Sequence, residues 1–107
     1  MELFRQAVAA EDKAIALETN LGDAFNVRGL AHKSIGQTKE AIQSFREAKA
    51  LLPNSTSIII NLGETLAEQG QFREAQTQLE DAVRLAGPDD PRPRAVLEKW
   101  QAKFKQQ

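Results

Sequence analysis

The chain has 107 residues, of which 41% are hydrophobic and 27% charged, and its formal net charge is −1. This length suits one domain, and the balanced charge creates no field of one sign that would attract nucleic acid or an anionic membrane. Cysteine is absent and histidine occurs once, so disulfides, thiolate catalysis and metal sites built from Cys or several His residues are excluded.

The sequence also contains no apolar run long enough for a membrane span, and its N-terminus lacks the pattern of a secretory signal. We therefore expect a soluble, intracellular protein, most simply a cytoplasmic one, without membrane insertion.

Alanine-rich residues 3–17 predict a first helix, and residues 18–20, Glu18-Thr19-Asn20, are expected to end it. A second helix is expected over residues 23–35, followed by a turn at Gly36-Gln37. A third is expected over residues 38–51, where Pro53 closes it because proline disfavours helix at the preceding residue.

Asn54 or Ser55 can cap a fourth helix that runs to residue 69 before Gly70. Residues 71–86 predict a fifth helix, which ends at Gly87-Pro88. After a charged, proline-rich link, residues 94–105 predict a last helix, with Asp89 or Asp90 as its cap. Its apolar face is formed by Val96, Leu97, Trp100 and Phe104.

The small residues of these helices recur at a spacing of 34 positions. Gly29, Ala41 and Ala48 return as Gly63, Ala75 and Ala82. The equivalent pairs also include Phe45 with Leu79, Leu51 with Leu85, and Gly36 with Gly70. In the first helix, Ala7, Ala14 and Leu17 take the places of Ala41, Ala48 and Leu51. A fixed period of this length indicates a stack of helical repeats.

With these residues and this period, the chain resembles a tetratricopeptide-repeat protein. The resemblance implies an all-α fold, a right-handed superhelical array of antiparallel helix pairs. It implies one domain: a half repeat (helix B only) over residues 1–21, full repeats over 22–55 and 56–89, and a capping helix over 90–107. It also implies that Gly29, Ala41 and Ala48 lie where neighbouring helices approach closely.

The resemblance further implies a scaffold that binds a peptide segment or a partner helix in a concave groove lined by the first helix of each repeat. The family's groove positions fall here on Asp23, Asn26, Val27, Leu30, Lys33 and Ser34, and on Ser57, Ile60, Asn61, Glu64, Ala67 and Glu68. From these we predict a peptide-binding set of Asn26, Val27, Leu30, Lys33, Ile60, Asn61, Glu64 and Glu68. Asn61 matches a family asparagine that holds the peptide backbone.

Nothing in the sequence predicts an enzyme. The single His32 cannot build a catalytic triad and is expected to pack between helices, and the glycines form no phosphate loop. Glu64 and Glu68 share a helix face, but no basic or metal-binding partner for them is visible in the sequence, so solvation explains them. We expect no cofactor, no metal and no nucleic-acid partner.

A second hypothesis concerns residues 3–17. If they form the second helix of a repeat whose first helix is missing, their apolar face is open, and an open face of that kind often meets another protein. The chain would then be a self-assembly module, a homodimer through its N-terminal helix, or a fragment of a longer array.

Overall fold

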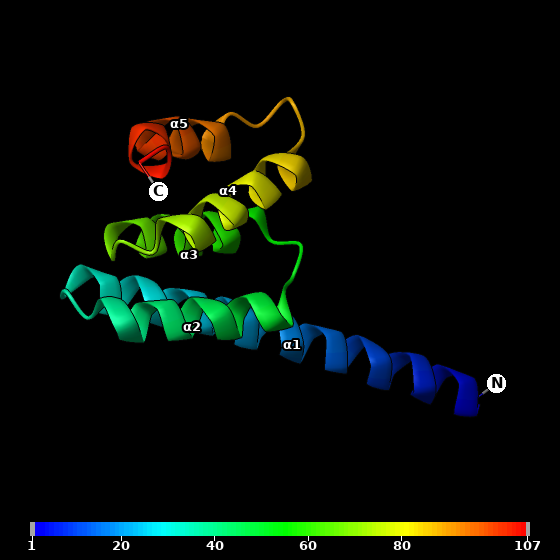
Figure 1. The fold of residues 1–107 in the computed structure, drawn as a ribbon. Helices are drawn as coiled ribbons and strands as arrows, with labels where there is room; N and C mark the ends of the chain where they lie inside the picture. The colour runs from blue at the N-terminus through cyan, green and yellow to red at the C-terminus, as the bar shows by residue number, and fades with distance from the viewer. Residues whose placement is uncertain (1, 107) are drawn as a thin grey trace.

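The computed structural model describes the backbone of residues 2–106 and the side-chain burial of residues 16–106. Five α-helices make up the described chain: α1 (Glu2–Ser34), α2 (Thr38–Leu51), α3 (Thr56–Glu68), α4 (Phe72–Ala86) and α5 (Arg92–Phe104). They pack as sequential antiparallel pairs (Figure 1), so the predicted all-helical repeat fold is confirmed.

The breaks between the helices have local causes. Gly36 and Gly70 follow α1 and α3 with φ of 82° and 87°, a left-handed conformation that glycine adopts without steric cost. Ser55 caps α3 as predicted, since its side chain accepts a hydrogen bond from the backbone N–H of Ile58. The predicted bounds of α2 are reproduced, and those of α3 and α4 differ by one or two residues.

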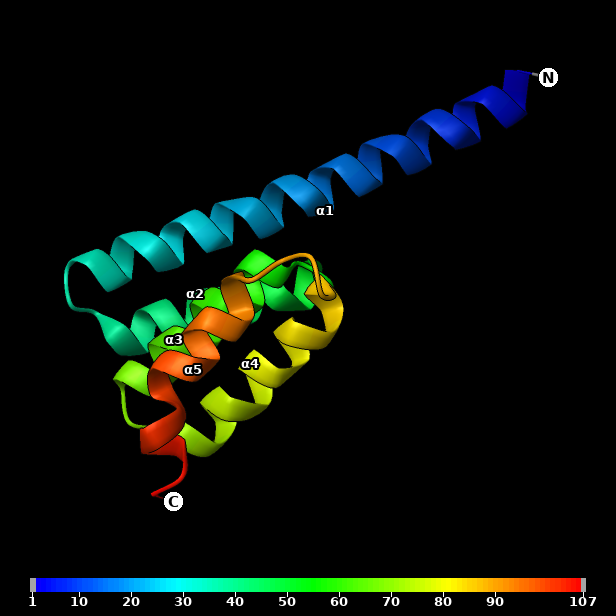
Figure 2. The same ribbon diagram turned by 90° about the horizontal axis from the view of Figure 1, so that it is seen from above.

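The prediction of two separate helices at the N-terminus is wrong. α1 continues without interruption from Glu2 to Ser34, and Glu18-Thr19-Asn20 lies inside it. The physical reason is that these three residues include neither proline nor glycine, so no backbone hydrogen bond is removed and no left-handed turn is favoured there. The N-terminal half of α1 extends beyond the other helices (Figure 2).

The last helix begins earlier than predicted, at Arg92. Pro91 is its N-cap residue, and the Asp90 carboxylate accepts a hydrogen bond from the backbone N–H of Arg92 at 3.0 Å, which satisfies a donor of the first turn. The apolar face of α5 turns inward: Phe104 is buried, and the Phe72 ring lies 6.3 Å from Trp100 and 6.2 Å from Phe104. α5 therefore packs against α4.

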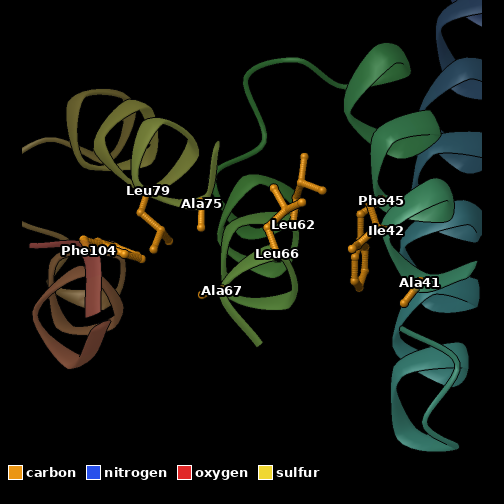
Figure 3. Close-up of a cluster of buried hydrophobic side chains, with 9 residues drawn as sticks. All are labelled: Ala41, Ile42, Phe45, Leu62, Leu66, Ala67, Ala75, Leu79 and Phe104. Atoms are coloured by element: carbon orange, nitrogen blue, oxygen red, sulfur yellow. The ribbon is translucent and has the colours of Figure 1, made fainter. Parts of the chain in front are cut away.

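One hydrophobic core runs through α2, α3, α4 and α5 (Figure 3). Its members are Ala41, Ile42, Phe45, Leu62, Leu66, Ala67, Ala75, Leu79 and Phe104. The repeated glycines lie where helices approach closely, as predicted. A Cβ atom at Gly29 would meet the Phe45 ring at 2.5 Å, and one at Gly63 would meet Leu79 Cγ at 2.8 Å. The 34-residue spacing therefore corresponds to the same kind of contact, once between α1 and α2 and once between α3 and α4.

Candidate partner-binding surface

The predicted binding residues occupy the neighbouring helices α1 and α3. We call their location the α1–α3 face, defined as Asn26, Val27, Leu30 and Lys33 of α1 with Ile60, Asn61, Glu64 and Glu68 of α3. α3 contacts both α1 and α5, so α5 borders this face on its far side. The candidate site thus lies on α1 and α3, the same helices that carry the close contacts of Gly29 and Gly63.

Two amides meet between the helices on this face. Asn61 Nδ2 donates a hydrogen bond to Asn26 Oδ1 at 3.0 Å, and both residues are half-buried. The bond uses one N–H of Asn61 and leaves its carbonyl oxygen, while Asn26 keeps its NH₂ group as a donor. The pair therefore still offers both an acceptor and donors.

Charged residues continue the polar contacts along the face. Lys33 Nζ lies 3.2 Å from Glu64 Oε1 and 3.4 Å from Glu68 Oε1. The other oxygen of Glu64, Oε2, lies 3.6 Å from Lys99 Nζ of α5. The view that Glu64 and Glu68 lack a basic partner is wrong: the repeat stacking brings lysines to them from two other helices.

Lys99 is the residue of this network that the sequence did not reveal. Lys99 lies outside the apolar stripe of Val96, Leu97, Trp100 and Phe104, and the sequence of its own helix gives no sign of a partner. The signal available was indirect: α5 stands where the first helix of a third repeat would stand, which places it next to α3. A polar contact from Arg92 Nη1 to Ser57 Oγ at 3.2 Å joins the same two helices near their starts.

The apolar residues of the predicted set differ in exposure. Val27 is 64% exposed and Leu30 is 43% exposed, whereas Ile60 is half-buried. Ala67, which the groove pattern also placed on the surface, is buried in the hydrophobic core. Ala67 is therefore not available to a partner, and the apolar part of the face lies mainly on α1.

A separate polar contact joins α2 and α4, the two helices that do not contribute to the α1–α3 face or its α5 border. Arg46 and Glu74 form a two-pronged ion pair, with Nη1–Oε2 and Nη2–Oε1 distances of 2.5 and 3.0 Å. The hydrogen bond from Arg46 lowers the pKa of Glu74, and the same contact raises the pKa of Arg46. One turn further on, Lys49 Nζ donates to Gln78 Oε1 at 2.7 Å.

Three surface cavities lie away from the α1–α3 face. The largest, of about 490 Å³, is formed by the turn into α4 and its first residues, from Gly70 to Thr77. A second, of about 320 Å³, lies between α2 and α4 beside Arg46 and Gln78. The third, of about 220 Å³, lies between α1 and α2 beside His32 and Glu47.

Among the described side chains no group of three or more His, Cys, Asp and Glu residues could hold a metal ion. His32 is half-buried near the end of α1, where its Nδ1 lies 2.6 Å from Gln37 Oε1 across the turn. Within the described chain, none of the helices combines the length and hydropathy needed to cross a membrane.

The comparisons with known proteins agree with the fold. A family profile described as "Tetratricopeptide repeat" matches residues 36–99, which include α2, α3, α4 and the N-terminal part of α5. No curated protein matches the chain. Such repeats are generally protein-interaction modules and are typically non-catalytic. Since the match covers more than half of its length, the chain belongs to the tetratricopeptide repeat family.

Proposed function

We propose that this protein is a non-catalytic adaptor that binds an extended peptide segment of a partner on the α1–α3 face. The observation that carries the proposal is the Asn26–Asn61 amide pair between the two helices. A peptide backbone presents alternating N–H and C=O groups, and the groups that the pair leaves free can bond to both kinds. A partner helix has its backbone groups paired internally, so the amides favour an extended segment.

The charges around the amides also bear on the partner. Lys33 of the face and Lys99 of the neighbouring α5 are matched by Glu64 and Glu68, so the face and its α5 border together carry no excess of either charge. A strongly acidic or basic peptide would have to disrupt these pairs. A peptide with apolar side chains can instead cover Val27 and Leu30, which are exposed beside the amides. We therefore propose a largely uncharged segment with apolar anchors.

A random peptide library selected against the whole chain tests this proposal. Selected peptides are then measured by calorimetry against the wild-type chain, Asn61→Ala and Leu30→Glu. We expect each variant to weaken binding by about tenfold or more, because the first removes a backbone partner and the second places a charge among apolar anchors.

Asn54→Ala is the matched control, because Asn54 is exposed in the turn before α3, outside the face. Circular dichroism and the thermal midpoint verify that each variant is folded. The proposal fails if selected peptides bind Asn61→Ala and Leu30→Glu as tightly as they bind the wild type, or if Asn54→Ala weakens them equally.

A second candidate function is self-association through the N-terminal helix. It is favoured by exposed apolar residues outside the α1–α3 face: Leu17 and Leu21 of α1 and Ile35 of the turn that follows it are more than half exposed. The two functions use different faces of α1 and can coexist.

A further inference from the structure

We propose that α1 pairs antiparallel with α1 of a second copy of this chain, with the two-fold axis at the level of Thr19. The surface involved is the outer stripe, defined in the described part as Leu17, Leu21, Ala24, Arg28 and Ala31 of α1 with Ile35 of the turn that follows it. This inference is independent of peptide binding, because the outer stripe lies on another side of α1 from Asn26 and Lys33.

The first observation is that the outer stripe occupies a side of the helix that is covered elsewhere in the molecule. Counted 34 residues forward, Ala24, Arg28 and Ala31 correspond to Ile58, Leu62 and Thr65 of α3. Those three α3 residues are buried, whereas their α1 counterparts are all exposed. Leu17, Leu21 and Ile35 extend the same stripe and are 63%, 51% and 69% exposed. An exposed apolar stripe of this length marks an interaction surface.

The second observation is the spacing of the stripe. Its members are separated alternately by four and three residues, which is the heptad spacing of helices that pair along a seam. The same spacing continues towards the N-terminus through Ala14, Ala10, Ala7 and Leu3. Because α1 is one helix from Glu2 to Ser34, the seam runs along nearly all of its length, about 50 Å. A heptad pattern sustained this far favours a helix–helix pair.

The third observation is that the seam is complementary to itself. In an antiparallel pair centred on position 19, each seam position faces another seam position. The facing pairs of positions within α1 are Ala7 with Ala31, Ala10 with Arg28, Ala14 with Ala24, and Leu17 with Leu21, and position 3 is at the level of Ile35 in the turn after α1. For residues 3–14 the pairing rests on their spacing along the α1 backbone. Ala faces Ala and Leu faces Leu, apart from the layer that contains Arg28.

The layer with Arg28 supplies charge complementarity. In the described part of the chain Arg28 has no ion-pair partner. By its position along the α1 backbone, Glu11 of the second copy, the residue after Ala10, falls at the level of Arg28 in the proposed register. By symmetry the two positions are juxtaposed twice. A partner helix without a matching acidic residue would leave the charge of Arg28 unpaired on an otherwise apolar seam. The layer therefore favours a second copy of this chain over an unrelated apolar helix.

The repeat pattern supports the same register. Residues 3–17 correspond, 34 positions back, to α2, and within the chain α2 packs antiparallel to α3. In the proposed dimer residues 3–17 of one copy lie antiparallel to the 21–35 segment of the other. In the proposed dimer, residues 3–17 of each copy thus cover the outer stripe of the other copy. Within one chain they extend beyond the other helices, because α1 continues straight (Figure 2).

Sedimentation and disulfide trapping test the proposal on the full chain. We expect wild-type protein at micromolar to millimolar concentrations to reach twice the chain mass of 11.8 kDa. Since the chain has no native cysteine, Leu17→Cys and Leu21→Cys can be mixed as single variants. Disulfides require close Cα atoms, and the proposed register places position 17 of one chain opposite position 21 of the other. We therefore expect mixed disulfides between the two variants to exceed disulfides between two chains of the same variant.

Substitutions probe the seam in the reduced state. Ala24→Glu is expected to weaken dimerisation more than tenfold, whereas Leu85→Glu, at an exposed leucine of α4, leaves it unchanged. Arg28→Glu is expected to weaken the dimer and Glu11→Arg with Arg28→Glu to restore it. A monomeric wild type at every concentration overturns the proposal, as do same-variant disulfides that exceed the mixed one. Peptide binding to the α1–α3 face is measured separately on Ala24→Glu, so failure of one proposal does not imply failure of the other.

Discussion

At the scale of single residues, the repeated small residues matter because larger side chains would not fit between the packed helices. Gly29 and Gly63 stand where a Cβ atom would collide with Phe45 and Leu79. These contacts could be predicted from the sequence, because the resemblance to tetratricopeptide repeats implies close helix approaches at the recurring small residues. The contacts of Lys99 could not, because they join helices at positions outside the repeated pattern and depend on how α5 lies beside α3.

Gly63→Leu should destabilise the fold before it affects any binding surface. The new side chain would enter the space of Leu79, and overpacking of this kind costs about 1–3 kcal/mol. For a domain of this size, each kcal/mol corresponds to a fall in the thermal midpoint of about 4–8 °C. Ala102→Leu, at an exposed position of α5, is the control and should leave the midpoint unchanged. An unaltered midpoint in Gly63→Leu would contradict the assigned close approach.

The Arg46–Glu74 pair should make stability depend on pH in the acidic range. The pKa of Glu74 is lower in the folded chain than in the unfolded chain, so the unfolded state takes up the proton first. The stabilisation is therefore complete above the unfolded pKa of about 4.3 and is lost as the pH falls through the lowered folded pKa. Both side chains are more than a third exposed, so solvent screening keeps the contribution below about 1 kcal/mol.

Thermal midpoints between neutral pH and strongly acidic pH test this assignment. We expect Glu74→Gln to be less stable than wild type at neutral pH and to approach it in acid, where wild-type Glu74 is protonated. Glu80→Gln, on an exposed part of the same helix, is the control. A constant difference between Glu74→Gln and wild type at all pH values would show that the charge of Glu74 is irrelevant.

At the scale of helices, α1 is where the sequence-based expectation and the structure differ most. Repeat spacing predicts a break near Asn20, yet Glu18-Thr19-Asn20 supplies only weak opposition to a helix that continues on both sides. By contrast, the ends of α2, α3 and α4 were predicted well because glycine, proline or a serine cap stands at each of them. Local breakers thus decide helix ends more strongly than analogy between repeats.

Thr19→Pro tests the continuity of α1. Proline removes a backbone hydrogen bond and clashes with the preceding turn, which costs about 3 kcal/mol in a helix interior. We expect lower helicity by circular dichroism and a loss of the proposed dimer. The thermal midpoint of the α2–α5 core should change little, because Thr19 precedes Gly22 and Gly29, where α1 packs against α2. Thr19→Ala is the matched control. Unchanged helicity in Thr19→Pro would mean that α1 is already interrupted there.

The link between α3 and α5 through Glu64 gives a second prediction for the helices. Glu64 is less exposed than Lys99 and pairs with lysines of both α1 and α5. Glu64→Gln should lower the free energy of unfolding by up to about 1 kcal/mol, as expected for a partly exposed network. Lys105→Ala, an exposed lysine just after α5, should have no effect. If Glu64→Gln is as stable as wild type at low salt, this network does not contribute to the stability of the fold.

At the scale of the whole molecule, the packing of five helices leaves a polar face and an apolar stripe on different sides of α1. The family's repeat pattern predicted which residues share the α1–α3 face, because three- and four-residue spacings define helix faces. It did not predict that Asn26 bonds to Asn61, nor that Ala67 is buried, since both depend on how closely α1, α3 and α4 pack.

The central proposal is that the amide pair on the α1–α3 face holds a peptide backbone. The measurement that tests it most directly is calorimetric binding of a library-selected peptide to wild type, Asn61→Ala and the control Asn54→Ala. We expect the affinity to fall by about tenfold or more in Asn61→Ala and to be retained in Asn54→Ala, with all three chains equally helical. Equal affinity for wild type and Asn61→Ala would contradict it and place partner binding elsewhere on the molecule.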